Sequence, residues 1–433
     1  MNIVTTLRTR INNPLLRNTI IYTLSDALSK GLSFLTLPFI SYYLIPEQLG
    51  IAANFDVLAS IVCLIAGQAI VNGLPYFYYD RSKASVAKLI FNLIFIIVLI
   101  LIILCSIILL CSGVINNYLQ LALSLQLLTI VSVFSTLLIS IDTIVFRLEN
   151  KPIIFAVLQV TYTVIYLSFL CWLVIGARME AIGKIYSLVA TNIIMAVVHT
   201  LLLYRRGFVI FKFCGNSIKE LLRFGVPLMP HSLSFWLKSG TDKIILTTYC
   251  GLAANGLYSM AMSFGAIYSI FNTAFSNAYV PYLQERLSKI TPETEEKEHK
   301  SIVKWSYKVM MMFVLLFIAV ILACWLVINY VLSTNYADSF QFIPWILLSL
   351  LIKSFYTMVV QFPYSKKKTL GLGIVTFTCA LIQMLLTLMM VRYIGLNGIK
   401  YSLVAGATLT MIGVWWLSNK IYPLPWFGFY KSK

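Results

Sequence analysis

The stretch from Leu89 to Leu110 limits what this chain can fold into more than any other feature of its sequence. Asn92 is its only polar side chain before Cys105. About 20 mostly apolar residues are enough for one helix to cross a lipid bilayer. The whole chain is 60% hydrophobic and only 11% charged, whereas soluble domains carry about 25% charged residues. The sequence therefore predicts an all-α integral membrane protein.

Similar apolar runs recur along the chain between short polar breaks. They give twelve candidate transmembrane helices, at about 18–45, 51–79, 87–112, 118–146, 153–176, 181–204, 221–248, 252–284, 305–330, 339–362, 370–391 and 398–419. The first, second and seventh of these spans are less apolar than the rest and carry charges. Polar positions inside a membrane are tolerated where they face protein or water. These three spans are therefore expected to line a cavity.

The basic residues alternate with the predicted spans. Of the 33 lysines and arginines, 25 fall in the termini and the even-numbered loops, four fall in the odd-numbered loops and four fall inside spans. Cytoplasmic loops of membrane proteins carry the excess of lysine and arginine. We therefore expect a multi-pass protein with both termini in the cytoplasm and no cleavable signal peptide. The net charge of +18 then indicates orientation, and no nucleic-acid partner is expected.

Short sequence matches indicate that the chain consists of two related halves. Tyr186–Ala190 in the sixth span and Tyr401–Ala405 in the twelfth have the same five residues, each preceded by a glycine. A Leu-Leu-Arg triplet opens both the first and the seventh spans. Two halves of six spans have the same orientation, which predicts a pseudo-two-fold axis along the membrane normal. The predicted lobes are residues 1–206 and 221–433, joined by a cytoplasmic linker at 207–220.

Eight charged residues fall inside the predicted spans, where charges are costly and mark function by default. They are Asp26, Lys30, Asp56, Asp142, Lys238, Asp242, Lys243 and Lys353. Asp26 and Lys30 are four residues apart, as are Lys238 and Asp242, so each couple shares a helix face. One interpretation is that the charges form ion pairs that fix helix packing. The other is that they line a hydrophilic cavity between the two halves, suited to an anion.

The second interpretation assigns roles to particular side chains. The residues predicted to bind substrate are Lys30, Lys238, Lys243, Lys353, Asn72 and Tyr76, and the candidates for a coupling ion are Asp26, Asp56, Asp142 and Asp242. Tyr76 belongs to an aromatic run at the end of the second span. Such rings stack on sugars, but tyrosines also gather at membrane interfaces, so both interpretations stay open for Tyr76.

The sequence gives no sign of a metal site, a cofactor or catalytic residues. Its eight cysteines form no CxxC motif, its three histidines do not cluster, and no GxxxxGK[ST] motif for ATP occurs. A membrane enzyme acting on sugars would be expected to carry a large outward loop with catalytic charges. The odd-numbered loops are short, and the longest, 329–338, is nearly uncharged. A transporter is therefore favoured over an enzyme.

Several motifs resemble those of one transporter family. The segment Thr241–Leu246, followed by the glycines, tyrosine and serine of 251–261, looks like the seventh-to-eighth-span signature of Wzx-type oligosaccharide flippases. These belong to the polysaccharide transporter family, in the superfamily of multidrug, oligosaccharidyl-lipid and polysaccharide exporters. Residues 18–50, 147–151 and 393–398 are similar as well. The resemblance covers essentially the whole chain. It departs at Ile45, where the family often has glycine, and at Tyr42 and Tyr43, where an arginine is common.

The resemblance implies a fold and an activity. Members have two six-helix lobes around a central, often cationic cavity. They move an undecaprenyl-diphosphate-linked oligosaccharide to the outer leaflet of the bacterial plasma (inner) membrane by alternating access, with proposed coupling to an ion gradient. The product serves O-antigen or other surface polysaccharide synthesis. Expected partners are the lipid-linked substrate, membrane lipids, a polysaccharide polymerase and a chain-length regulator. The alternative is a drug or cation antiporter of the related extruder type.

Overall fold

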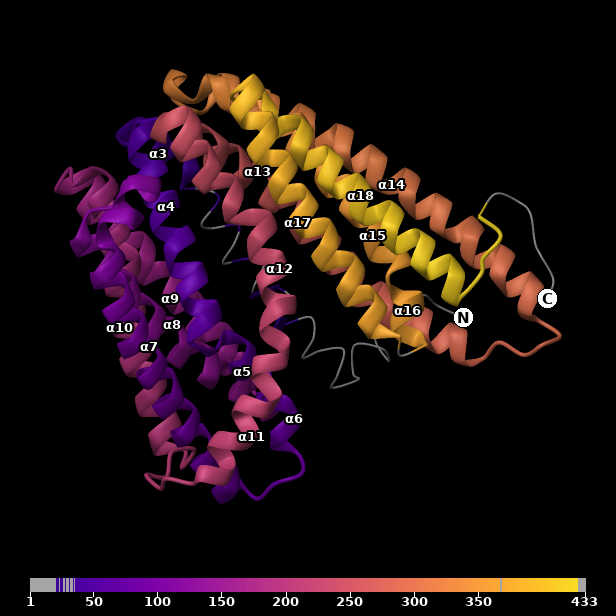
Figure 1. The fold of residues 1–433 in the computed structure, drawn as a ribbon, viewed down its shortest axis with the longest axis horizontal. Helices are drawn as coiled ribbons and strands as arrows, with labels where there is room; N and C mark the ends of the chain where they lie inside the picture. Colours follow the sequence, from indigo (N-terminus) through magenta and orange to yellow (C-terminus); the bar gives the residue numbers. More distant parts are fainter. Residues whose placement is uncertain are drawn as a thin grey trace, which may run out of the picture. The chain divides into compact units, whose positions relative to one another are not determined.

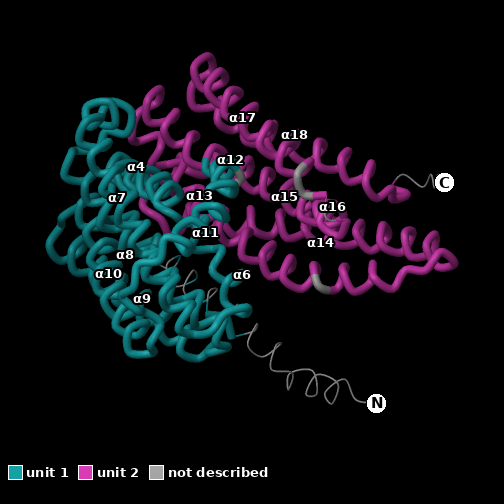
Figure 2. The backbone as a smooth tube through the Cα atoms, turned by 60° about the horizontal axis from the view of Figure 1, so that its bottom comes forward, with its two compact units in different colours: residues 1–236 teal, residues 237–433 magenta. Residues whose placement is uncertain are grey.

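In the computed structural model, the described part of the chain comprises residues 36–366 and 368–426, together with 21, 22, 24, 25, 28, 31 and 34. Every regular element within these residues is helical (Figure 1). The chain divides into two compact units, Met1–Trp236 (unit 1) and Leu237–Lys433 (unit 2), coloured teal and magenta in Figure 2.

Unit 1 is built around α8, which packs against α4, α7, α9 and α10. Its elements are α3 (Leu37–Tyr43), α4 (Pro46–Cys63), a π-helical turn (Leu64–Gln68), α5 (Ala69–Val71), α6 (Leu74–Tyr78), α7 (Lys83–Leu119), α8 (Leu123–Leu148), α9 (Pro152–Leu170), a second π-helical turn (Cys171–Gly176), α10 (Glu180–Arg205), α11 (Gly215–Gly225) and a 3-10 turn (Val226–Leu228). Pro46 and Pro152 occupy first-turn positions of α4 and α9, where the missing N–H costs nothing. Gln120 ends α7 in the left-handed conformation.

Unit 2 is built around α18, which packs against α15 and α17. Figure 1 shows α17 and α18 side by side. The elements here are α12 (Met229–Ser239), which crosses the unit boundary, α13 (Thr241–Ser288), α14 (Glu295–Tyr330), a 3-10 segment (Thr334–Gln341), α15 (Ile343–Val359), α16 (Gln361–Ser365), α17 (Thr369–Ile394) and α18 (Asn397–Ile421).

Nine helical stretches in the described residues are long and apolar enough to cross a membrane. They are Pro46–Tyr78, Lys83–Leu119, Leu123–Leu148, Pro152–Gly176, Glu180–Arg205, Glu295–Tyr330, Ile343–Ser365, Gly371–Ile394 and Asn397–Ile421. Each corresponds to one predicted span. The first predicted span lies partly outside the described residues, and α3 covers its end. The seventh and eighth lie along α11, α12 and α13, and Gly251, with φ of 85°, breaks α13 at the predicted gap between them.

The repeated five-residue motif has similar surroundings in both units. Gly183 lies in the first turn of α10 close to the backbone of Leu173, and Gly398 lies in the first turn of α18 against the backbone of Met390; a Cβ would be tight at Gly183 and would clash at Gly398. Ser187 and Ser402, four residues further on, are both fully buried. Close backbone approach at small residues is a common way to pack membrane helices. A duplicated helix pair would produce this match, while the lobe boundaries at 206 and 221 stay predictions.

Candidate functional site

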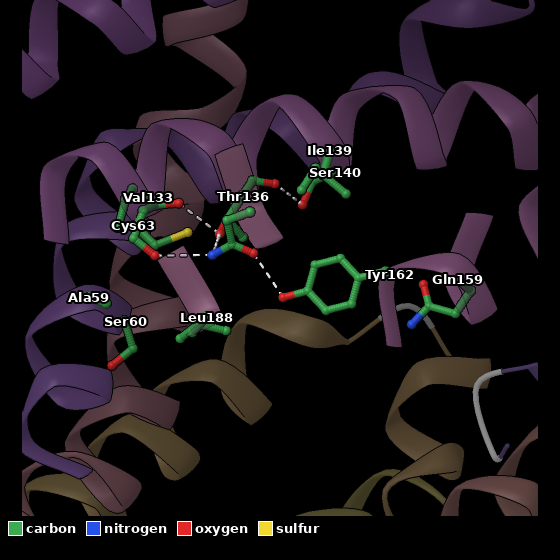
Figure 3. Close-up of a pocket in the computed structure, with 12 residues that line it drawn as sticks. Ala59, Ser60, Cys63, Val133, Thr136, Ile139, Ser140, Gln159, Tyr162 and Leu188 are labelled. Atoms are coloured by element: carbon green, nitrogen blue, oxygen red, sulfur yellow. Dashed lines mark hydrogen bonds between the residues drawn. The ribbon is translucent and has the colours of Figure 1, made fainter. Parts of the chain in front are cut away.

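Unit 1 contains a cavity of about 440 Å³ between α4, α8, α9 and α10, lined by both polar and apolar residues (Figure 3). Cavities of this size accept small-molecule ligands. The lining residues are Ala59, Ser60, Cys63, Ser132, Val133, Thr136, Ile139, Ser140, Gln159, Tyr162, Leu188 and Asn192. α4, which is part of the second predicted span, contributes Ala59, Ser60 and Cys63 to this wall. Hydroxyl, phenol, thiol and amide groups supply the polarity of this wall.

One buried amide holds three of the cavity helices together. Asn192 of α10 is only 4% exposed. Its Nδ2 donates to Ser132 Oγ at 3.0 Å and to Thr136 Oγ1 at 3.3 Å, both on α8. Its Oδ1 accepts from the Tyr162 hydroxyl of α9 at 2.8 Å. Ser132, Thr136 and Ser140 lie on one face of α8 because they are spaced by four residues. The network fixes the cavity wall before any ligand binds.

Other polar groups of the cavity are available to a ligand. The Gln159 side chain is half-buried in the wall. In Figure 3 it lies apart from the hydrogen bonds drawn as dashed lines. Within the described residues, its amide has no hydrogen-bond partner. A primary amide offers two donors and one acceptor oxygen. Ser60 Oγ accepts from Trp236 Nε1 at 3.0 Å, which orients this hydroxyl in the wall.

The predicted residues of unit 1 occupy different surroundings. Asp56 is exposed on α4, one turn before Ser60, and its charge acts on Tyr162 and Tyr166 of α9. Asn72 is not a lining residue, but hydrogen bonds through Gln68 connect it to Cys63 in the cavity wall. Gln68 donates to Asn72 Oδ1 at 3.0 Å and accepts from the Cys63 thiol at 3.2 Å. Tyr76 is 73% exposed and its ring lies against Phe224 of α11, 5.3 Å between centroids. Asp26 and Lys30 lie outside the described residues.

Asp142 is enclosed in a buried ion network at the C-terminal end of α8. It is completely buried. The His199 ring donates from Nδ1 to Oδ2 over 2.7 Å, and Arg206 pairs with Oδ1. Arg206 also pairs with Glu149 and lies over the Phe146 ring at 3.8 Å. Both partners of Asp142 come from the α10 helix and its end, so no spacing within α8 could have revealed them.

Two of the predicted lysines of unit 2, Lys238 and Lys353, lie on α12 and α15. Lys238 donates from Nζ to Thr410 Oγ1 at 2.9 Å, and the charge of Lys353 on α15 repels that of Lys238. The Lys353 side chain is exposed, and that of Lys243 is half-buried. Two neighbouring ammonium groups can attract a diphosphate as point charges.

Asp242 is the most deeply buried of the predicted residues of unit 2, with an exposed fraction of 1%. It accepts from Thr387 Oγ1 at 3.2 Å and from the Tyr258 hydroxyl at 3.4 Å, and Thr387 also donates to Ser402 at 3.0 Å. Among the described basic residues, none forms an ion pair with it. Lys238 and Asp242 have separate partners because the turn at Gly240 lies between α12 and α13. A buried carboxyl with neutral partners can accept a proton or a cation.

The sequence interpretation missed most of the cavity wall in unit 1. It singled out charges and the polar residues of the first, second, seventh and eighth spans, whereas Ser132, Thr136, Gln159, Tyr162 and Asn192 come from the fourth, fifth and sixth. A usable signal was present, since the hydroxyls of α8 recur at a spacing of four on one helix face. Asn192, a lone amide in an apolar span, was the other clue.

Comparisons with known proteins agree with this architecture. The family model described as "Polysaccharide biosynthesis protein" matches residues 15–287. Protein 1 of the Lsg locus of Haemophilus influenzae is 24% identical over 412 residues, which are 89% of this chain and 95% of that protein. The inward closed structure of the lipid II flippase MurJ superposes with a TM-score of 0.76 over 92% of this chain and 87% of its own, at 14% identity.

An inward-facing multidrug transporter of the MATE family superposes with a TM-score of 0.73 over 90% of this chain and 94% of its own, again at 14% identity. At this identity the two structural matches show a shared two-lobe helical fold. The sequence match carries the family assignment, because the model covers more than half of the chain. The chain therefore belongs to the polysaccharide biosynthesis protein family.

Proposed function

We propose that this protein moves an oligosaccharide linked to undecaprenyl diphosphate from the cytoplasmic to the outer leaflet of the bacterial plasma membrane. The flipped unit would serve the synthesis of O-antigen or another surface polysaccharide. The observation that carries the proposal is the cavity of hydroxyl and amide groups in unit 1, within a chain of the polysaccharide family. A sugar leaving water loses many hydrogen bonds, and such a wall replaces them.

The diphosphate is proposed to bind in unit 2. Lys238 and Lys353 are the favoured contacts, because their charges already act on each other and therefore favour an anion between them. Lys243 and Lys30 remain further candidates from the sequence. In this scheme unit 1 binds the sugar and unit 2 binds the diphosphate, while the polyprenyl chain stays in lipid. The two units would change their access from one side to the other during the cycle.

An ion gradient is proposed to drive the cycle through Asp242. This carboxyl is buried, is held by two hydroxyls and forms no ion pair with a described residue. Asp142 is a weaker candidate than the sequence indicated, because Arg206 forms an ion pair with it and the His199 ring is hydrogen-bonded to it. Asp56 is exposed and is assigned a different role below.

The orientation proposed from the charges places both termini in the cytoplasm. The segment around Glu295 would then be cytoplasmic and that around Asp338 external. An impermeant thiol reagent applied to intact cells should label a cysteine at Asp338→Cys but not at Glu295→Cys, and the reverse pattern would contradict the orientation. The polymerase and chain-length regulator stay proposed partners on the external side.

The test of the proposed function is a flipping assay in proteoliposomes. The purified chain should move an undecaprenyl-diphosphate-linked oligosaccharide to the opposite leaflet, read as sugar that becomes accessible to an added glycosidase. Replacing both lysines, Lys238→Gln with Lys353→Gln, should slow this by about tenfold or more, since hydrogen bonds to charged groups contribute about 1.5–3 kcal/mol. Lys300→Gln, an exposed lysine near the start of α14, is the matched control. Export of cationic dyes without movement of the lipid would favour an extruder-type antiporter instead.

A further inference from the structure

We propose that the sugar residue held in the unit 1 cavity is uncharged, and that Asp56 excludes sugars that carry a carboxylate. This inference rests on the proposed function, because it assigns a substrate class to the same cavity. The experiment gives one result if this inference fails and a different result if the proposed function fails.

The cavity wall is built to bind neutral hydroxyl and amide groups. None of its twelve described lining residues carries a charge. Within the described residues, the Gln159 amide can both donate and accept, whereas the hydroxyls of Ser60, Ser140 and Tyr162 already donate within the protein and offer acceptor oxygens. Such groups match the hydroxyls and acetamido groups of neutral sugars. An ionised carboxylate in this wall would lack a counter-charge, and an unpaired charge is costly away from water.

Asp56 adds a negative charge to one side of the cavity. It lies three and four residues before Ala59 and Ser60, so it shares the helix face through which α4 lines the cavity. Its side chain is exposed, and its charge acts on Tyr162, which belongs to the wall, and on Tyr166, one turn further along α9. A sugar carboxylate in the cavity would therefore meet a like charge, which is a common device for rejecting a wrong ligand.

Two arginines and one histidine of α8, α10 and the end of α10 are engaged elsewhere. Arg206 pairs with Asp142 and Glu149, and the His199 ring donates to Asp142. Arg147 lies over the rings of Phe155 and Tyr22, at 4.8 Å and 5.9 Å from their centroids. These arginines contact carboxylates and aromatic rings that lie outside the cavity lining. Within the described residues of α4, Asp56 is the charged side chain on the helix face that lines the cavity.

The experiment compares two lipids that differ only at carbon 6 of one sugar. Proteoliposomes containing the full chain receive undecaprenyl diphosphate carrying either one glucose or one glucuronic acid. The wild-type protein should flip the glucose lipid about tenfold faster. Asp56→Asn should reduce that ratio to about threefold or less, and Asp56→Lys should reverse it. Glu47→Gln removes another exposed carboxylate of α4, outside the cavity, and should leave the ratio unchanged.

A second measurement reports occupancy of the cavity itself. Cys63 lines the wall, and none of the eight cysteines is in a disulfide, so the other seven can be replaced by serine. The glucose lipid should slow alkylation of Cys63, whereas the glucuronic acid lipid should not. Equal flipping and equal protection by both lipids in the wild-type protein would overturn the inference and leave the proposed function standing. If neither lipid moves, the proposed function fails.

Discussion

Arg206 is the side chain on which the charge balance of unit 1 depends. It pairs with both Asp142, which is completely buried, and Glu149, while its guanidinium lies over the Phe146 ring. A planar guanidinium suits this combination of two carboxylates and one ring better than an ammonium group would. Removing one partner of a buried ion pair leaves an uncompensated charge, and this costs about 3–5 kcal/mol.

Arg206→Gln should therefore destabilise the protein strongly. The expected result is a large fall in Tm in detergent, or loss of folded protein from the membrane, because the Asp142 carboxylate would keep only the His199 ring as a partner. The neighbouring residue supplies the control. Arg205 is exposed, and Arg205→Gln should leave Tm nearly unchanged. Equal Tm values for the two variants would contradict the structural role assigned to Arg206.

At the level of single residues, the sequence identified the charged side chains inside the spans but few of the neutral polar side chains that line the cavity. An aspartate in an apolar span is visible at once, and Asp142 and Asp242 are indeed buried. Serines and threonines of membrane helices commonly bond to their own backbone, as Thr136 and Ser140 do here, so their presence does not reveal a cavity. The cavity depends on contacts between α8, α9 and α10, which local spacing does not encode.

At the scale of elements, apolar runs located the helices because hydrophobic length and membrane thickness are physically linked. The same reasoning predicted a break between the seventh and eighth spans, and Gly251 with its positive φ provides it. The π-helical turns at Leu64–Gln68 and Cys171–Gly176 were not predicted, since they arise from packing within the fold. The acid–base couple at Lys238 and Asp242 was expected on one helix face, but the turn at Gly240 separates α12 from α13.

The close packing of Gly398 at the start of α18 allows a prediction about helix packing. A Cβ on Gly398 would lie 2.3 Å from the carbonyl carbon of Met390, so Gly398→Ala should push α18 away from α17. Overpacking of this kind costs about 1–3 kcal/mol, which should appear as a lower Tm. Gly373→Ala on α17 is the matched control, because nothing lies within 4 Å of its Cβ position. An equal Tm for both variants would show that the close approach is dispensable.

At the scale of the whole molecule, the question is what drives the cycle. If Asp242 binds the coupling ion, Asp242→Asn should abolish the acceleration of flipping by a proton or sodium gradient. Asparagine keeps an acceptor for Thr387 but loses the charge. Flipping without a gradient should persist. Asp338→Asn, an exposed acid of the same unit, should respond to the gradient like wild type. A gradient response that survives Asp242→Asn would exclude this carboxyl as the coupling site.

The ion network of unit 1 has a consequence for how the protein is made. Asp142 belongs to α8, whereas His199 and Arg206 belong to α10 and its end, which are synthesised two helices later. An unpaired aspartate costs about 2.5–3.5 kcal/mol at the centre of an inserted helix, and less toward its ends. Insertion of the α8 helix into lipid on its own is therefore expected to be unfavourable. We expect α8, α9 and α10 to leave the insertion machinery as a group, once translation has passed Arg206.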